Sequence, residues 1–205
     1  MYRRAGGAVA PSALDVDASP APGRGEDDET QLIHAALTDP GAFEALYHRY
    51  RDRVHGYLRM RTASEEDAAD LLQHVFVRVL DTLPRYQARR GTFAAWLFRI
   101  ARNAAIDFHR RRRVTIAWDL VPLALHPSTE ETAEARVLRQ EDRARLAALI
   151  RALDPLKRDV LTLRFVGRLT VPEIAVVIGK REDATRKPLT RTLQTLKERY
   201  DEPSM

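Results

Sequence analysis

A regular spacing of apolar residues between Asp67 and Leu80 is the feature that most constrains how this chain can fold. Apolar side chains recur there at every third or fourth position, which places them along one side of an α-helix. They are Ala68, Leu71, Leu72, Val75, Phe76, Val79 and Leu80. We therefore expect this side of the helix to be buried in a core.

The opposite side of the same helix carries hydrogen-bonding side chains around one valine. Its residues are Asp70, Gln73, His74, Val77 and Asp81, at positions that a helix brings into one line. Because carboxylate and amide oxygens bind guanidinium groups well, such a surface suits a partner that is rich in arginine.

The segment that follows Pro84 is strongly basic. Nine arginines stand against a single acid, Asp107, so the segment 85–113 has a formal charge of +8. The nine are Arg85, Arg89, Arg90, Arg99, Arg102, Arg110, Arg111, Arg112 and Arg113. Such a density of positive charge predicts a surface that binds a polyanion.

Aromatic side chains lie among these arginines. Trp96 and Phe108 fit a helical apolar stripe, so we expect them to pack in the core. Phe98 falls off that stripe and is a candidate for stacking on an unpaired base, which contributes about 1 to 3 kcal/mol per base. Taken with the acceptor surface, this pattern indicates a protein that docks on a larger assembly and contacts opened nucleic acid.

The composition excludes several classes of protein. The 205 residues include no cysteine, which rules out disulfides and thiolate metal sites. No apolar run reaches the roughly 18 residues of a membrane span, and the first 28 residues lack a signal-peptide core. The six histidines show no metalloprotease spacing, and there is no glycine-rich phosphate loop. We expect a soluble cytoplasmic protein without membrane insertion, enzymatic activity or a cofactor.

Breaks in the apolar pattern divide the chain into four parts. Residues 1–28 are rich in Gly, Ala, Pro and Ser and predict a disordered N-terminal extension. Residues 29–113 have helical spacing, with Ser64 as an N-cap, and predict one helical domain. The spacing fails over 114–140, a predicted flexible linker, and resumes over 141–201. The predicted fold class is all-α, with two small helical domains joined by the linker.

Capping signals predict the first residues of two helices in the C-terminal part. Asp154-Pro155 combines an N-cap with a proline at the first helical position, where the missing amide costs nothing. Thr170 and Glu173 form a capping box that opens the next helix.

A basic helix is expected after Gly179, from about Glu182 to Tyr200. Two short helices separated by a glycine turn predict a helix-turn-helix. Residues 179–199 hold seven basic side chains against three acids, a formal charge of +4, which favours DNA binding.

Several runs of residues share the pattern of a known family. They are DLLQHVFVR (70–78), RGTFAAWLFRIARN (90–103) and AID (105–107) before four arginines, and LDP (153–155), VLTLRF (160–165), LT (169–170), EIA (173–175) and Gly179. The first three resemble domain two of the extracytoplasmic-function (ECF) sigma factors of the sigma-70 superfamily. The others resemble domain four of the same family.

The resemblance implies a sigma factor that binds core RNA polymerase, recognises the minus-thirty-five and minus-ten promoter elements and promotes DNA melting. It also implies an anti-sigma factor as a partner. The residues implied to bind polymerase are Asp70, Gln73, His74 and Val77. Those implied to bind minus-ten DNA are Arg85, Arg89, Arg90, Phe98, Asn103, Arg110, Arg111, Arg112 and Arg113. Those implied to bind the minus-thirty-five element are Arg181, Thr185, Arg186, Lys187 and Arg191.

Two residues depart from the family pattern. His74 stands where the family usually has an acid, so the acceptor surface carries one negative charge fewer. Pro188 stands in the expected recognition helix, where an interior proline costs about 3 kcal/mol. Because Thr185 is a competent N-cap, we expect this helix to begin there, with Pro188 in its first turn. A continuous helix from Glu182 is the alternative.

A different function also fits a basic helix-turn-helix. A stand-alone transcription regulator would bind duplex DNA tightly without polymerase, and its N-terminal domain would serve sensing or dimerisation. A sigma factor should bind duplex DNA poorly by itself, so DNA binding without polymerase distinguishes the two.

Overall fold

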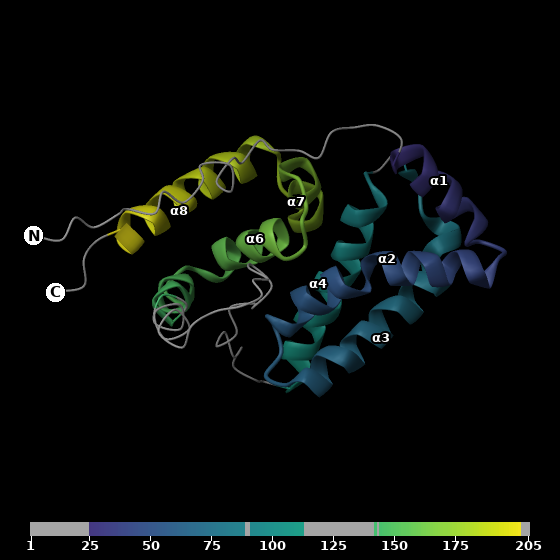
Figure 1. Cartoon of the computed structure of the whole chain (residues 1–205), viewed down its shortest axis with the longest axis horizontal. Helices are drawn as coiled ribbons and strands as arrows, with labels where there is room; N and C mark the ends of the chain where they lie inside the picture. The colour runs from purple at the N-terminus through teal and green to yellow at the C-terminus, as the bar shows by residue number, and fades with distance from the viewer. Residues whose placement is uncertain (1–24, 89–90, 113–141, 143, 202–205) are drawn as a thin grey trace, which may run out of the picture.

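The computed structural model describes residues 25–88, 91–112, 142 and 144–201. Every regular element in these ranges is helical (Figure 1), which confirms the predicted all-α class. The elements are α1 (Gly25–Ala35), α2 (Pro40–Arg59), α3 (Glu65–Thr82), the short 3-10 helix η2 (Leu83–Arg85), α4 (Phe93–Arg112), α6 (Pro155–Phe165), α7 (Val171–Ile178) and α8 (Asp183–Asp201), and residues 144–151 are helical too. The predicted linker 114–140 and most of the predicted N-terminal extension lie outside these ranges.

The N-terminal domain, residues 25–112, is held together by the apolar sides of α2, α3 and α4. Leu46 and Tyr57 of α2, Val75 of α3 and Leu97 of α4 are almost completely buried in this core. Local hydrogen bonds set where the helices start: the Ser64 hydroxyl accepts from the backbone amide of the third residue of α3 at 3.0 Å, as the sequence predicts.

Two predictions for this domain are wrong in detail. The first helix begins at Gly25, four residues earlier than expected, so the acidic run that follows lies within it. Glu29 in that helix accepts a 2.5 Å hydrogen bond from the Tyr50 hydroxyl, which attaches α1 to α2. Leu80 is 52% exposed, although its spacing placed it on the buried side of α3.

The C-terminal domain, residues 144–201, follows its predicted start signals closely. The Asp154 carboxylate accepts from the Lys157 amide at 3.0 Å and caps α6. The capping box of α7 is complete, with the Thr170 amide donating to the Glu173 carboxylate at 2.7 Å. Gly179 ends α7 with a φ of 68°, a left-handed conformation that suits glycine.

The recognition helix does not begin where we expected. α8 starts at Asp183 and runs through Pro188 without interruption, so the predicted start at Thr185 is wrong. The amides of Thr185 and Arg186 both donate to the Glu182 carbonyl, at 2.9 and 2.8 Å, so Thr185 already lies within the first turn. Glu182 therefore occupies the N-cap position.

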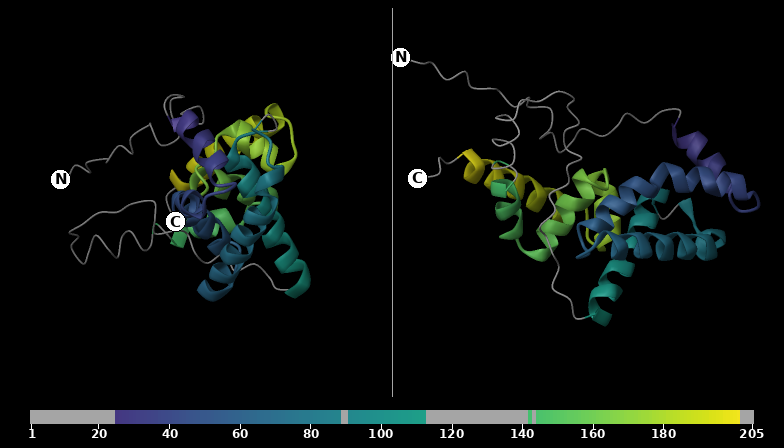
Figure 2. Two further views of the ribbon diagram at one scale, coloured as in Figure 1. Left: turned by 90° about the vertical axis from the view of Figure 1, so that its right-hand side faces the viewer. Right: turned by 60° about the horizontal axis from the view of Figure 1, so that its bottom comes forward.

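The two domains pack against each other, a contact that the sequence did not predict. Among the C-terminal helices, α7 makes the extensive contact with α4, and α8 extends away from the N-terminal domain (Figure 1 and the right-hand view of Figure 2). One hydrophobic core runs through both domains and includes Phe98 of α4, Leu163 of α6 and Ile174 of α7.

Candidate nucleic-acid interface

The predicted acceptor surface of α3 is present and faces solvent. Asp70, Gln73, His74 and Val77 are all exposed, and Val77 is 59% exposed. Leu80 lies one turn further along the helix and enlarges the apolar centre of this surface. Val77 and Leu80 thus form an exposed apolar pair next to the hydrogen-bonding side chains of this surface.

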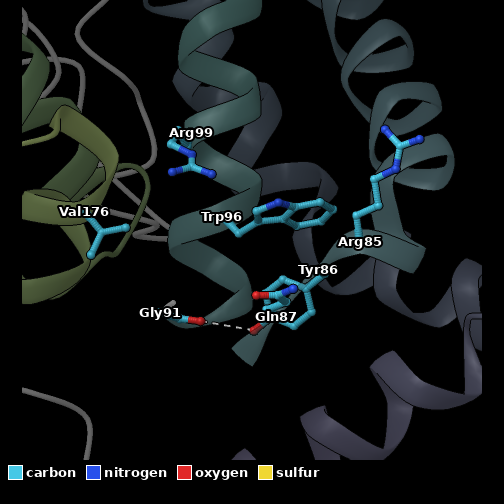
Figure 3. Close-up of a pocket in the computed structure, with 7 residues that line it drawn as sticks. All are labelled: Arg85, Tyr86, Gln87, Gly91, Trp96, Arg99 and Val176. Atoms are coloured by element: carbon cyan, nitrogen blue, oxygen red, sulfur yellow. Dashed lines mark hydrogen bonds between the residues drawn. The ribbon is translucent and has the colours of Figure 1, made fainter. Parts of the chain in front are cut away.

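A pocket lies between the segment after α3 and the first turns of α4 (Figure 3). Its lining residues are Arg85, Tyr86, Gln87, Gly91, Trp96, Arg99 and Val176. The first six come from the +8 segment and the last comes from α7 of the C-terminal domain. The pocket therefore combines aromatic rings, two guanidinium groups and an amide.

Local structure shapes this pocket. The Tyr86 hydroxyl donates to the Gly91 carbonyl at 3.2 Å and closes the loop between η2 and α4 (Figure 3). Gly91 has a φ of 129°, a region that side-chain-bearing residues rarely adopt. The Thr92 hydroxyl then accepts from the Ala95 amide at 3.2 Å and caps α4. Burial, with a smaller contribution from Glu29, raises the pKa of Tyr86.

Aromatic contacts hold the Trp96 ring in place. It lies 5.2 Å from the Tyr86 ring and 5.5 Å from the Phe93 ring, measured between ring centroids. Trp96 is only half-buried, and Arg99 follows it by one helical turn. A fixed, partly exposed indole can stack on an unpaired base, and a guanidinium group beside it can contact the phosphate of that base.

Further predicted DNA-binding residues continue along α4. Asn103, Arg110 and Arg111 are exposed. Arg110 lies 3.2 Å from the Asp107 carboxylate, but both side chains face solvent, so this pair contributes little to stability. The side chain of Arg112 and the residues Arg89, Arg90 and Arg113 lie outside the described part of the chain.

The outer surface of α8 carries most of the residues predicted to bind the minus-thirty-five element. Arg181 precedes the helix, and Lys187 and Arg191 lie on it, all three exposed. Arg186 is half-exposed, and its guanidinium group lies 2.6 Å from the Glu182 carboxylate.

Thr185 contradicts the prediction of a DNA contact. It is 2% exposed, and its hydroxyl donates to the Arg181 carbonyl at 3.1 Å. Thr185 lies within α8, four residues before Leu189, and so falls on the buried side of the helix with Leu189 and Leu196.

Phe98 also contradicts its predicted role. It is completely buried and makes an edge-to-face contact with Tyr57, with ring centroids 5.6 Å apart. A Cβ atom on Gly167 of the C-terminal domain would lie 3.0 Å from the Phe98 ring, so this side of α4 is covered by the second domain. Phe98 packs in the core, whereas Trp96 of the same helix is half-exposed.

Comparison with known proteins identifies both domains. The family profile of Sigma-70 region 2 matches residues 46–115, and that of Sigma-70 region 4 matches residues 143–200, together more than half of the chain. The ECF RNA polymerase sigma factor BldN of Streptomyces coelicolor is 31% identical over 81% of this chain. This chain belongs to the ECF sigma factor family. It spans 63% of the length of BldN.

Other members of the ECF sigma factor family align over more of their length. SigD of Mycobacterium tuberculosis is 28% identical over 85% of this chain and 84% of its own. The solved structure of CnrH in complex with the cytosolic domain of CnrY has a TM-score of 0.61 and 27% identity, covering 86% of this chain and 99% of CnrH.

Sequence reasoning missed part of the pocket of this ECF sigma factor. Trp96 was assigned to the core, and Arg99 was counted only as one of the nine arginines of the basic segment. The available signal was the spacing of Trp96 and Arg99, which a helix brings to one side next to the loop that carries Arg85.

Two kinds of site are not found among the described residues. No group of three histidine or acidic side chains there is arranged to hold a metal ion. None of the helices in the described ranges is long and apolar enough to cross a membrane.

Proposed function

We propose that this ECF sigma factor binds core RNA polymerase in the cytoplasm through the acceptor surface of α3, takes an unstacked minus-ten base into the α4 pocket, and reads the minus-thirty-five element with α8. The observation that carries the proposal is the pocket itself, which is lined by Trp96 and Arg99 of α4 and by Arg85 of η2. This pocket lies within the segment that matches Sigma-70 region 2.

The contacts that the pocket offers are comparable in free energy to the cost of extruding a base from the duplex. Extruding a base from a duplex costs a few kcal/mol, and stacking on an aromatic ring returns about 1 to 3 kcal/mol. The arginines of α4 supply phosphate contacts that offset the rest. Because the Trp96 indole is already held in place, it loses little side-chain entropy when a base binds, which favours binding.

The acceptor surface of α3 suits binding to core RNA polymerase. Asp70 and Gln73 lie one turn apart and are not covered by any described part of the chain. Charge-assisted hydrogen bonds contribute about 1.5 to 3 kcal/mol each, so two of them with the apolar pair Val77 and Leu80 would make a stable contact with polymerase.

We further propose an anti-sigma factor as a regulatory partner and no catalytic activity for the chain itself. The structure of CnrH in complex with the cytosolic domain of CnrY supports such a partner. The stand-alone regulator is less well supported because it gives no role to the pocket of the N-terminal domain.

Transcription with purified core polymerase on a promoter library tests this proposal. We expect Trp96→Ala and Arg99→Gln to retain polymerase binding in a pull-down but to lose at least about tenfold in open-complex formation, the effect of about 1.4 kcal/mol. Arg51→Gln, at an exposed arginine of α2 outside the pocket, is the matched control. Open complexes formed equally well by the Arg99 and Arg51 variants would contradict the pocket assignment.

The polymerase contact is tested in the same assay. The double variant Asp70→Ala with Gln73→Ala should lose polymerase binding while it stays folded, since both side chains are exposed. Unchanged binding would remove α3 from the proposed interface.

A further inference from the structure

The two domains are joined by an ionic cluster around Asp159. This α6 residue is 4% exposed and accepts hydrogen bonds from three side chains of the N-terminal domain. The Tyr57 hydroxyl donates at 3.1 Å and the Arg102 Nε at 2.7 Å, and the Arg61 guanidinium group donates to the same carboxylate. One acid of the C-terminal domain thus neutralises two cations of the N-terminal domain.

A second contact lies beside this cluster. Arg53 of α2 donates from Nε and Nη2 to the Gly167 carbonyl, at 3.0 and 2.6 Å. Burial lowers the pKa of Arg53. A Cβ atom on Gly167 would lie 2.7 Å from the Leu163 carbonyl oxygen of its own domain and 3.0 Å from the Phe98 ring of the N-terminal domain, so glycine suits this position.

A third contact lies at the candidate minus-ten pocket. Val176 of α7 lines the pocket on the side of Arg99 and Gly91 (Figure 3), and a Cβ atom on Gly91 would lie 3.6 Å from the Val176 side chain. The Thr92 hydroxyl, beside Gly91, donates to the Glu173 carboxylate at 2.6 Å. The C-terminal domain therefore places an apolar side chain in the pocket wall and a carboxylate against Thr92, next to Gly91 of the lining.

Distance along DNA shows that this arrangement is not the promoter-bound one. Elements at minus ten and minus thirty-five are separated by about 25 base pairs, which is about 85 Å at a rise of 3.4 Å. α8 has 19 residues, so it is about 28 Å long, and it follows directly after α7, which touches the pocket. The two domains must separate before both elements can be bound.

We propose that the C-terminal domain competes with minus-ten DNA for the pocket surface of the N-terminal domain, and that Asp159 is the latch of this closed form. The proposal rests on the function proposed above for the pocket. A ligand that binds only the open form has its affinity reduced by the fraction of molecules that are open. Loss of the latch should therefore raise DNA affinity although no DNA-contacting residue has changed.

Domain separation can be measured directly because the chain has no cysteine. Ala45→Cys on α2 and Thr195→Cys on α8, both exposed, take spin labels for distance measurement by pulsed electron resonance on the full chain. We expect one narrow distance distribution in the parent protein. Asp159→Asn should add a longer, broader component. Asp201→Asn, the same change at an exposed acid of α8, should not.

DNA affinity is measured on the same proteins with a fluorescein-labelled pool of random single-stranded 12-mers. We expect Asp159→Asn to bind at least about tenfold more tightly than Asp201→Asn, which corrects for the equal change in net charge. If Asp159→Asn keeps the narrow distance distribution, or opens without a gain in affinity over the control, the proposal is overturned.

A second pair of variants tests the same proposal in case Asp159→Asn does not fold. Val176 is 37% exposed and lies on the same side of the pocket as Arg99, so Val176→Lys should repel Arg99 and open the protein. Val176→Glu should pair with Arg99 and keep it closed. Equal distance distributions for the two variants would overturn the proposal. The comparison of the Arg99 and Arg51 variants in transcription is read separately, so failure of the latch and failure of the pocket assignment give different results.

Discussion

Pro188 offers a quantitative test of how α8 is built. It is the sixth residue of a continuous helix, so its missing amide leaves the Ala184 carbonyl without its usual partner. A proline inside a helix costs about 3 kcal/mol relative to alanine. Two features reduce this cost here: Ala184 is exposed, so water can bond its carbonyl, and proline restricts the unfolded chain, which is worth about 0.4 to 1 kcal/mol.

We therefore expect Pro188→Ala to stabilise the protein by about 1 to 2 kcal/mol. For a chain of 150 to 250 residues this corresponds to a rise in Tm of about 2 to 8 °C. Thermal unfolding of the full chain followed by circular dichroism measures it.

The matched control is Pro172→Ala in the first turn of α7. An amide at that position would have no helical partner, so this variant should gain nothing. If both variants have the same Tm, or if Pro188→Ala lowers it, the continuous helix from Asp183 is refuted and a start at Thr185 is restored.

Three further outcomes test local features. Thr170→Ala should lose the N-cap of α7 and about 1 kcal/mol of stability in urea unfolding; no loss would mean that the cap is replaced. A hydrogen bond from the Lys157 amide lowers the pKa of Asp154. The ionised Asp154 carboxylate therefore stabilises the fold at any pH above the ordinary carboxyl pKa, and this stabilisation is lost as the pH falls through the lowered pKa. Asp154→Asn should therefore lower the urea midpoint at about pH 7 but not at about pH 2, whereas an equal loss at both would contradict the assignment. Replacing Arg110 and Arg111 with glutamine should reduce the salt slope of single-strand binding by about 0.7 per lost phosphate contact, and an unchanged slope would show that they do not contact phosphates.

Much of the secondary structure could be predicted because its determinants are close together in the chain. The caps at Ser64, Asp154 and Thr170 each involve a side chain and an amide three residues away. The stop at Gly179 depends on one residue that adopts a left-handed conformation. Such signals do not depend on what the helix later packs against.

The start of α8 was missed although the signals were local. Thr185 and Glu182 were both credible first residues, and Pro188 favoured the later one. The buried side of α8 decides between them, because a start at Asp183 directs Thr185 toward the core with Leu189. The energy of packing outweighs the local cost of the proline.

The sequence by itself determined the helices, the basic segment, the acceptor surface and the family to which the chain belongs. Only the tertiary structure decided which side of α4 stays open to solvent, because that depends on a second domain more than 50 residues further along. Phe98 is buried because Gly167 and Tyr57 lie against it, and Trp96 is left half-exposed at the pocket. Asp159 gives no signal in the sequence, since an acid on a helix normally faces water. It is buried here because Arg61 and Arg102 converge on it from the other domain.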